Sequence, residues 1–194
     1  MSQIVPDSAV EFIRGVYGDA LEWYKLAETK AQVILAIDTI FVSLLFGVVV
    51  SERVDLQATV SQFGYETWIF LTLTVCSLLL SIICVVACLI SRFSAREQRR
   101  AFRRLGVLAD ELDTYGPEVM WFFGLVSALD RELFAARIQT VDASFQVRAL
   151  AHQAHLLSRN VTRKHRWVNR GFLLVMMALI SLLSTGISLI IRAS

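Results

Sequence analysis

A single carboxylate, Asp38, stands near the middle of an apolar run of twenty residues, 31–50, that is otherwise uncharged. At about 1.5 Å per residue, a helix of this length crosses a hydrocarbon layer of about 30 Å. An ionised carboxylate facing lipid costs at least ~2.5–3.5 kcal/mol, so Asp38 should face other helices or water. Two roles fit the pattern: a neutral, hydrogen-bonded carboxyl that ties helices together, or an ionised carboxyl that lines a polar path between assembled subunits.

Small hydroxyl residues are the expected partners of Asp38. Asp38 lies about 10 Å beyond the inner end of its run. At that depth the other apolar runs present Ser81 and Ser181. We therefore predict a hydrogen bond from Asp38 to one of these serines and treat all three residues as a candidate polar or gating site. No lysine or arginine lies level with Asp38.

Arginine is the second residue type that could do chemistry here. Most arginines form rows beside the apolar runs, where their usual role is to fix topology and hold anionic lipid headgroups, at ~1 kcal/mol per residue. Arg131, Arg137 and Arg148 lie away from those rows. Because the guanidinium group offers phosphate a bidentate fork, these three are our candidates for binding a phosphate-bearing small ligand. Nucleic acid is not an expected partner, because acidic residues interrupt the basic surface and no stacking platform accompanies it.

The sequence offers no support for enzyme chemistry. It contains no Gly-rich phosphate loop, no nucleophile elbow and no Cys/His zinc pattern. His152 and His155 share one face of a predicted helix, but no acidic residue flanks them, so we interpret them as solvated or helix-packing side chains. We expect no catalytic residue, no metal site and no cofactor.

Three apolar runs must position these residues. The second and third runs, 68–90 and 171–191, carry no charge, and all three runs have the length of a transmembrane helix. Apolar residues recur at helical spacing in 1–30 and 92–170. We predict an all-α integral membrane protein, with three transmembrane helices and a helical cytoplasmic bundle.

The segments between the runs are also expected to be helical. One helix should run from about residue 8 into the first span. In 92–170 we expect a basic amphipathic helix over 92–114, a second helix from Pro117, and a third that includes Ile138 and continues into the last span.

Charge sets the orientation. Residues 92–170 hold 14 basic and 8 acidic side chains, whereas the loop 51–67 has one arginine and three acidic residues. Positively charged loops stay in the cytoplasm. The N-terminus and 92–170 should therefore be cytoplasmic, and the loop 51–67 and the C-terminus external.

Each span carries a stripe of small residues. Small residues let helices approach closely in lipid. We expect copies of the chain to form a homo-oligomer, but the sequence does not divide the stripes between that use and packing within one chain. The stripes are Thr39, Ser43 and Gly47 in the first span; Thr74, Ser77, Ser81, Cys84, Cys88 and Ser91 from the second; and Ala178, Ser181, Thr185 and Ser188 in the third.

Three short motifs resemble elements of a known family. Glu28-Thr29-Lys30-Ala31, followed by VILAID, is similar to the acidic-x-Lys-Ala element that opens the first span of the Pycsar transmembrane effectors of bacterial antiphage defence. Phe122-Phe123-Gly124 and Lys164-His165 stand where that family has its Phe-Gly and Lys-aromatic elements. This chain differs in having Glu28 where Asp is usual, Asp38 where Asn is usual and His165 where an aromatic residue is usual.

The resemblance implies a ligand-gated membrane effector and not an enzyme. In that system a cognate cyclase makes cyclic CMP or cyclic UMP on phage infection, and the effector responds by impairing the inner membrane, which leads to abortive infection. It implies a multi-pass protein of the bacterial inner membrane. Two alternatives stay open: a membrane scaffold or assembly protein with no ligand, and a pore-forming effector of another nucleotide second-messenger system.

Overall fold

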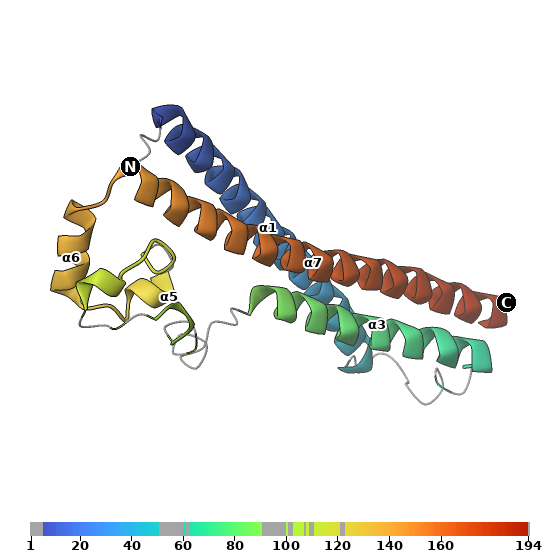
Figure 1. Ribbon diagram of the computed structural model, residues 1–194. Helices are drawn as coiled ribbons and strands as arrows, with labels where there is room; N and C mark the ends of the chain where they lie inside the picture. Colours follow the sequence, from blue (N-terminus) through green and yellow to red (C-terminus); the bar gives the residue numbers. More distant parts are fainter. Residues whose placement is uncertain are drawn as a thin grey trace. The chain divides into compact units, whose positions relative to one another are not determined.

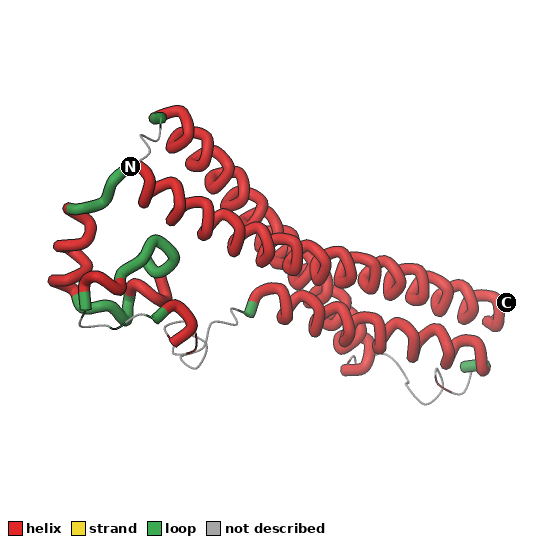
Figure 2. Tube along the Cα trace, in the orientation of Figure 1, coloured by secondary structure: helices red, strands yellow, loops and turns green. Residues whose placement is uncertain are grey.

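The computed structural model describes residues 6–50, 60, 63–90, 100, 103–106, 108, 111–120 and 123–193. Every regular element in these ranges is helical, which confirms the predicted all-α class (Figures 1 and 2). Three helices are long and apolar enough to cross a membrane: α1 (Asp7–Val50), α3 (Tyr65–Leu89) and α7 (Ala143–Ala193). The chain is therefore a membrane protein with three candidate spans.

Two of these helices are much longer than a membrane is thick. α1 has 44 residues and α7 has 51. At 1.5 Å per residue they measure about 66 and 77 Å, more than twice a hydrocarbon layer of about 30 Å. The N-terminal part of α1 therefore continues into the first span without a break, as its uninterrupted pattern predicts, and the third span is the C-terminal part of α7.

Aspartate caps set the start of α6 (Arg131–Gln139) and of α7. The Asp130 carboxylate accepts the backbone N–H groups of Glu132 and Leu133 at 2.9 and 3.0 Å. The Asp142 carboxylate accepts the N–H of Phe145 at 2.8 Å. Such caps satisfy N–H groups that have no partner within the helix. The predicted helix that runs unbroken from Ile138 into the third span is therefore wrong at its start, because residues 140–142 separate α6 from α7.

The sequence reading of residues 92–127 needs further correction. Residues 91–99, which include Arg92, Arg96 and Arg99, lie outside the described residues, as does most of the loop 51–67. Gly106 has a φ of +65°, a left-handed conformation that a continuous helix 92–114 cannot contain. Residues Leu112–Thr114 form a short 3₁₀ helix, η1. Residue 117 begins a turn instead of the predicted second helix, and α5 covers only Phe123–Val126.

The chain divides into two compact units. We call Met1–Lys25 with Ser91–Thr162 the extramembrane unit, and Leu26–Ile90 with Arg163–Ser194 the membrane unit. In the extramembrane unit, a small core forms around the buried residues Tyr115, Val119 and Leu125. The Tyr115 hydroxyl accepts the N–H of Asp130 at 3.1 Å, which joins the turn after η1 to the start of α6.

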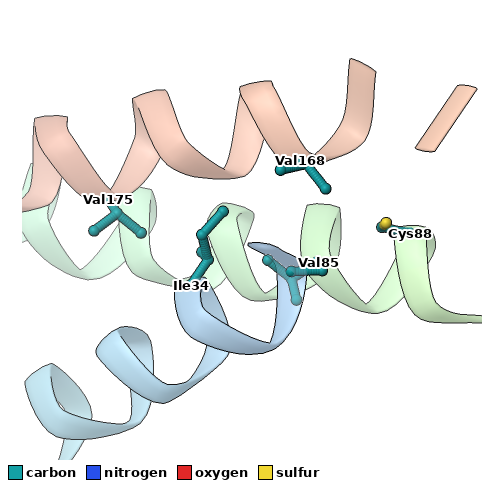
Figure 3. Close-up of a cluster of buried hydrophobic side chains, with 6 residues drawn as sticks. Ile34, Val85, Cys88, Val168 and Val175 are labelled. Carbon is teal, nitrogen blue, oxygen red and sulfur yellow. The ribbon is translucent and has the colours of Figure 1, made fainter. Parts of the chain in front are cut away.

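The core of the membrane unit lies where α1, α3 and α7 pack together (Figure 3). Ile34, Val85 and Val175 point into it from the three helices. Gly171 lets α7 approach α3 closely, since a Cβ there would lie 3.3 Å from a methyl group of Val85. The core also contains Ala31, Cys88 and Val168.

The structure divides the stripes of small residues between two environments. On α3 and α7 the stripes are buried within the chain, which fits close helix packing in lipid. On α1 the stripe lies on the exposed side, and nothing approaches within 4 Å of the position that a Cβ on Gly47 would take. The buried members are Thr74, Ser77, Ser81, Cys84, Cys88, Ala178, Ser181 and Thr185; the exposed members are Thr39, Ser43 and Gly47.

Candidate functional site

Asp38 lies at the point where the three spans meet. Its side chain on α1 is fully buried within the chain, at 0% exposure. The Ser81 hydroxyl on α3 donates to Asp38 Oδ2 at 2.8 Å. The same hydroxyl lies 3.3 Å from the backbone carbonyl oxygen of Gly171 on α7, a second acceptor. Asp38, Ser81 and Gly171 therefore form one polar contact that involves all three helices.

The surroundings of Asp38 favour a neutral carboxyl in this closed arrangement. Its other oxygen, Oδ1, is buried and has no hydrogen-bond partner, and no lysine or arginine among the described residues pairs with it. A buried carboxylate without a counter-ion carries a large desolvation cost. A protonated Asp38 could donate to Ser81, which would leave the serine proton for the Gly171 carbonyl. Water or a cation beside Asp38 would lower this desolvation cost, and the carboxyl group could then ionise.

Ser181, the other predicted partner, is buried but does not hydrogen-bond to Asp38. Its backbone carbonyl accepts the Thr185 hydroxyl at 2.9 Å, within α7. The sequence analysis matched residues of different spans by their distance from the inner ends of the apolar runs. For α1 and α7 this match differs from the register in the structure by about one helical turn. The register that the structure has brings Glu28 and Lys164, which precede the runs, into contact.

Glu28 on α1 and Lys164 on α7 form an ion pair. Lys164 Nζ lies 2.6 Å from Glu28 Oε1. The lysine side chain is 6% exposed and the glutamate side chain 36%. Ala27 and Ala31, one on each side of Glu28 along α1, are fully buried, and their small size lets α7 come close. The sequence analysis noted both charged residues in separate motifs but did not predict that they pair.

The three candidate arginines differ in their surroundings. Arg137 is half-buried: its Nε donates to the Tyr115 carbonyl at 3.2 Å, and its guanidinium group stacks over the Phe145 ring at 4.9 Å from the centroid. These contacts give Arg137 a structural role in the extramembrane unit. Arg131 and Arg148 are exposed. No contact among the described residues brings the three arginines into one site.

The motif residues can now be placed. Glu28 and Lys164 meet in the ion pair, and Phe123 and Gly124 begin α5, while Phe122 lies outside the described residues. The family model for the Pycsar effector protein domain matches residues 12–192 of the chain. The chain belongs to the Pycsar effector family. Comparison with curated proteins and with solved structures found no match.

Membership in the Pycsar effector family gives the chain a role as an effector of antiphage defence in a system linked to cyclic nucleotides. Two of the three departures from the family motifs fall on the contacts above. Glu28 is the acidic partner of the ion pair, so Glu and Asp share the relevant charge. Asp38 differs from Asn in being able to ionise, and the structure gives this difference a position between all three spans.

The histidines add no metal site to this Pycsar effector. His152 is half-buried and His155 exposed, both on α7. Among the described residues, no group of three or more His, Cys, Asp or Glu side chains could hold a metal ion.

Proposed function

We propose that this Pycsar effector senses a cyclic pyrimidine mononucleotide, cyclic CMP or cyclic UMP, on its cytoplasmic side and then impairs the bacterial inner membrane, which leads to abortive infection. A cognate cyclase would supply the nucleotide, and the effector itself would catalyse no reaction. The observation that carries the proposal is the family match over almost the whole chain, which includes all three spans.

The geometry of the membrane unit supports a closed state that ligand binding opens. Asp38 is fully buried within the chain in this arrangement, and the Ser81 hydroxyl lies between its carboxyl group and the Gly171 carbonyl. If α1 moves away from α3 and α7, water reaches the carboxyl and lets it ionise. A hydrated carboxylate between spans is the start of a polar path. In an assembly of several copies, such sites would lie in one ring.

The extramembrane unit is the proposed sensor. A cyclic mononucleotide carries one phosphate charge, for which exposed arginines such as Arg131 and Arg148 are suited. The hollow along the N-terminal part of α1 is less suited to an anion, because Glu11 and Asp19 line it and no arginine does. Arg137 contributes by holding the turn at Tyr115 against α6.

Calorimetry on the purified full-length protein tests the sensing proposal. We expect heat of binding with cyclic CMP or cyclic UMP, and a loss of binding of roughly tenfold or more on Arg148→Ala or Arg131→Ala. Arg159→Ala, an exposed arginine further along α7, is the matched control and should bind normally. Flat titrations with both nucleotides, using well-folded protein, would contradict sensing and favour a scaffold without a ligand.

The proposed orientation places the N-terminus and 92–170 in the cytoplasm, and the loop 51–67 and the C-terminus outside. Cysteine labelling in intact cells tests it. An impermeant reagent should react with Gln57→Cys but not with Gln98→Cys or Gln139→Cys, with the parent protein as control. Labelling of position 98 or 139 from outside would reverse the orientation.

The exposed α1 stripe supports assembly of several copies. The comparable stripes on α3 and α7 are buried inside the chain, whereas Thr39, Ser43 and Gly47 are open to a neighbour. Arginines close to the spans, such as Arg166 and Arg170, are exposed and suited to anionic lipid headgroups.

A further inference from the structure

The ion pair between Glu28 and Lys164 has a position that a merely stabilising contact would not need. Both residues lie within three positions of the point where their helix passes from the extramembrane unit into the membrane unit. α1 and α7 are the two described helices that continue through this boundary. Any movement carried from one unit to the other along these helices must pass the ion pair.

The ion pair is also one of the polar contacts that join α1 to its neighbours in the membrane unit. Glu28 pairs with Lys164 on α7, and Asp38 accepts a hydrogen bond from Ser81 on α3. The hydroxyl of Thr39, next to Asp38, donates to the carbonyl of Leu35 in its own helix. Release of the ion pair would therefore remove a charged contact between α1 and α7.

We propose that the Glu28–Lys164 ion pair holds the membrane unit closed, and that its release lets α1 separate from α7 so that water reaches Asp38. This inference rests on the proposed function, because it supplies the contact through which the sensor would control the membrane unit. The two partners suit the role unequally. Lys164 is nearly buried and needs its partner, whereas the Glu28 side chain is 36% exposed, so water and competing cations can reach it.

Reversing the charges of the pair one at a time and then together tests the proposal directly, in proteoliposomes that contain the full-length chain. Glu28→Lys and Lys164→Glu each place like charges together. Each should release an entrapped dye without any nucleotide, roughly tenfold or more faster than the parent protein. The double variant with both substitutions restores opposite charges and should return to the parent rate. Glu22→Lys and Arg159→Glu make the same changes at exposed positions on the same helices and should leave the rate unchanged.

Several outcomes would overturn the proposal. Single variants that insert normally and stay tight without nucleotide would show that the ion pair does not hold the closed state. A double variant that leaks as fast as the single variants would show that pairing is not what matters. If the reversed charges prevent insertion, Glu28→Gln is the deciding variant, because it keeps the size of the side chain and removes only its charge. A Glu28→Gln protein that inserts and does not leak dye would also contradict the proposal.

The failure of this inference can be separated from the failure of the proposed function. The parent protein with cyclic CMP and cyclic UMP forms a second arm of the same experiment. If the parent responds to neither nucleotide but Glu28→Lys leaks and the charge-swapped protein does not, the sensing proposal fails and the closing role of the pair stands. If the parent protein responds to a nucleotide and the single variants do not leak dye without one, the closing role of the pair fails and the sensing proposal stands.

Discussion

The inner and outer halves of the membrane unit are held together in different ways. In the inner half, all three spans are joined by polar contacts, through Glu28 with Lys164 and through Asp38, Ser81 and Gly171. In the outer half, the polar contacts found among the described residues join α3 to α7. Thr67 and Ser188 share a hydrogen bond of 2.9 Å, and the Arg192 guanidinium group lies against Gly64.

The difference identifies α1 as the span with the least buried outer half. α3 and α7 remain paired along their whole shared length, because buried small residues continue on both helices to Thr67 and Thr185. α1 has no buried residue beyond Asp38 among its described side chains. Hence the polar contacts described for α1 within the membrane unit hold its inner half to α3 and α7, and its outer half is open to other partners.

The largest expected effect comes from removing the polar group at the inner half. Asp38→Leu replaces a buried carboxyl with an apolar side chain of similar size, so the closed state keeps its packing and nothing remains to attract water. We expect this variant to reach the membrane normally but to lose nucleotide-dependent permeabilisation, measured as dye uptake by cells that express the cyclase.

Asp38→Asn is the matched comparison, since it keeps the shape and the hydrogen bond but cannot ionise. This variant should still permeabilise cells, with altered ion selectivity. A Leu variant that permeabilises cells as well as the parent protein would show that Asp38 neither gates nor lines the path.

A smaller effect is expected from Ser81→Ala, which removes the hydrogen bond that the Asp38 carboxyl group makes among the described residues. The carboxyl would then be buried with neither oxygen paired. We expect a loss of about 1–2 kcal/mol in the free energy of unfolding in detergent, followed by circular dichroism. Ser77→Ala, a buried serine one turn away on the same helix, should cost less. Equal losses of unfolding free energy in the two variants would show that the hydrogen bond between Ser81 and Asp38 adds no stability beyond that of an ordinary buried serine.

The outer half should respond less still. Thr67→Val keeps the shape of the side chain and removes its hydrogen bond to Ser188, which for a bond between membrane helices costs about 0.6 kcal/mol. Because α1 takes no part in this contact, nucleotide-dependent dye uptake should stay at the parent level. A Thr67→Val protein that loses its response would mean that the outer half also controls α1.

The smallest expected effect lies outside both halves, at the start of α7. The hydrogen bonds from Phe145 N–H and then from the Ser144 hydroxyl hold the pKa of Asp142 below its ordinary value. A carboxylate with a lowered folded-state pKa stabilises the fold above its unfolded pKa, and this contribution is lost as the pH falls through the folded pKa.

We therefore expect helicity around the start of α7 to become slightly less stable below about pH 4, measured as a shift in the thermal melt. Asp142→Asn retains a capping side chain but does not titrate, and should show less of this acid shift. An identical acid shift in both proteins would place its origin elsewhere.

Long, strongly periodic features were the most predictable from sequence. Three apolar runs are enough to give three spans, and the depth of Asp38 within its run pointed to Ser81. Ser181 was a poor candidate, because the ends of an apolar run fix the register of a helix only to within about a turn. The Glu28–Lys164 pair reports the register, yet its residues are 136 positions apart and nothing local links them.

The extramembrane unit was less predictable, since its short helices depend on turn geometry. Gly106 in a left-handed conformation and the turn around Pro117 interrupt a pattern that otherwise fits longer helices. The break before Asp142 does have a local signal, because aspartate followed by Ser144 is typical of a helix start. The three arginines were chosen by their distance from the spans, and that criterion could not show that Arg137 is occupied by Tyr115 and Phe145.

The most direct test of the central claim is whether the nucleotide separates α1 from its neighbours in the inner half. Ile34 is 5% exposed and packs in the core between the three spans, so a cysteine there reports separation while Asp38 stays intact (Figure 3). In a background in which Cys76, Cys84 and Cys88 are replaced by alanine, we expect a water-soluble thiol reagent to label Ile34→Cys slowly. Labelling should become roughly tenfold faster when the nucleotide is present. Gln32→Cys, at an exposed position on α1, should react at one rate in both conditions. Equal, slow labelling of position 34 with and without the nucleotide, in protein that binds it, would contradict the account.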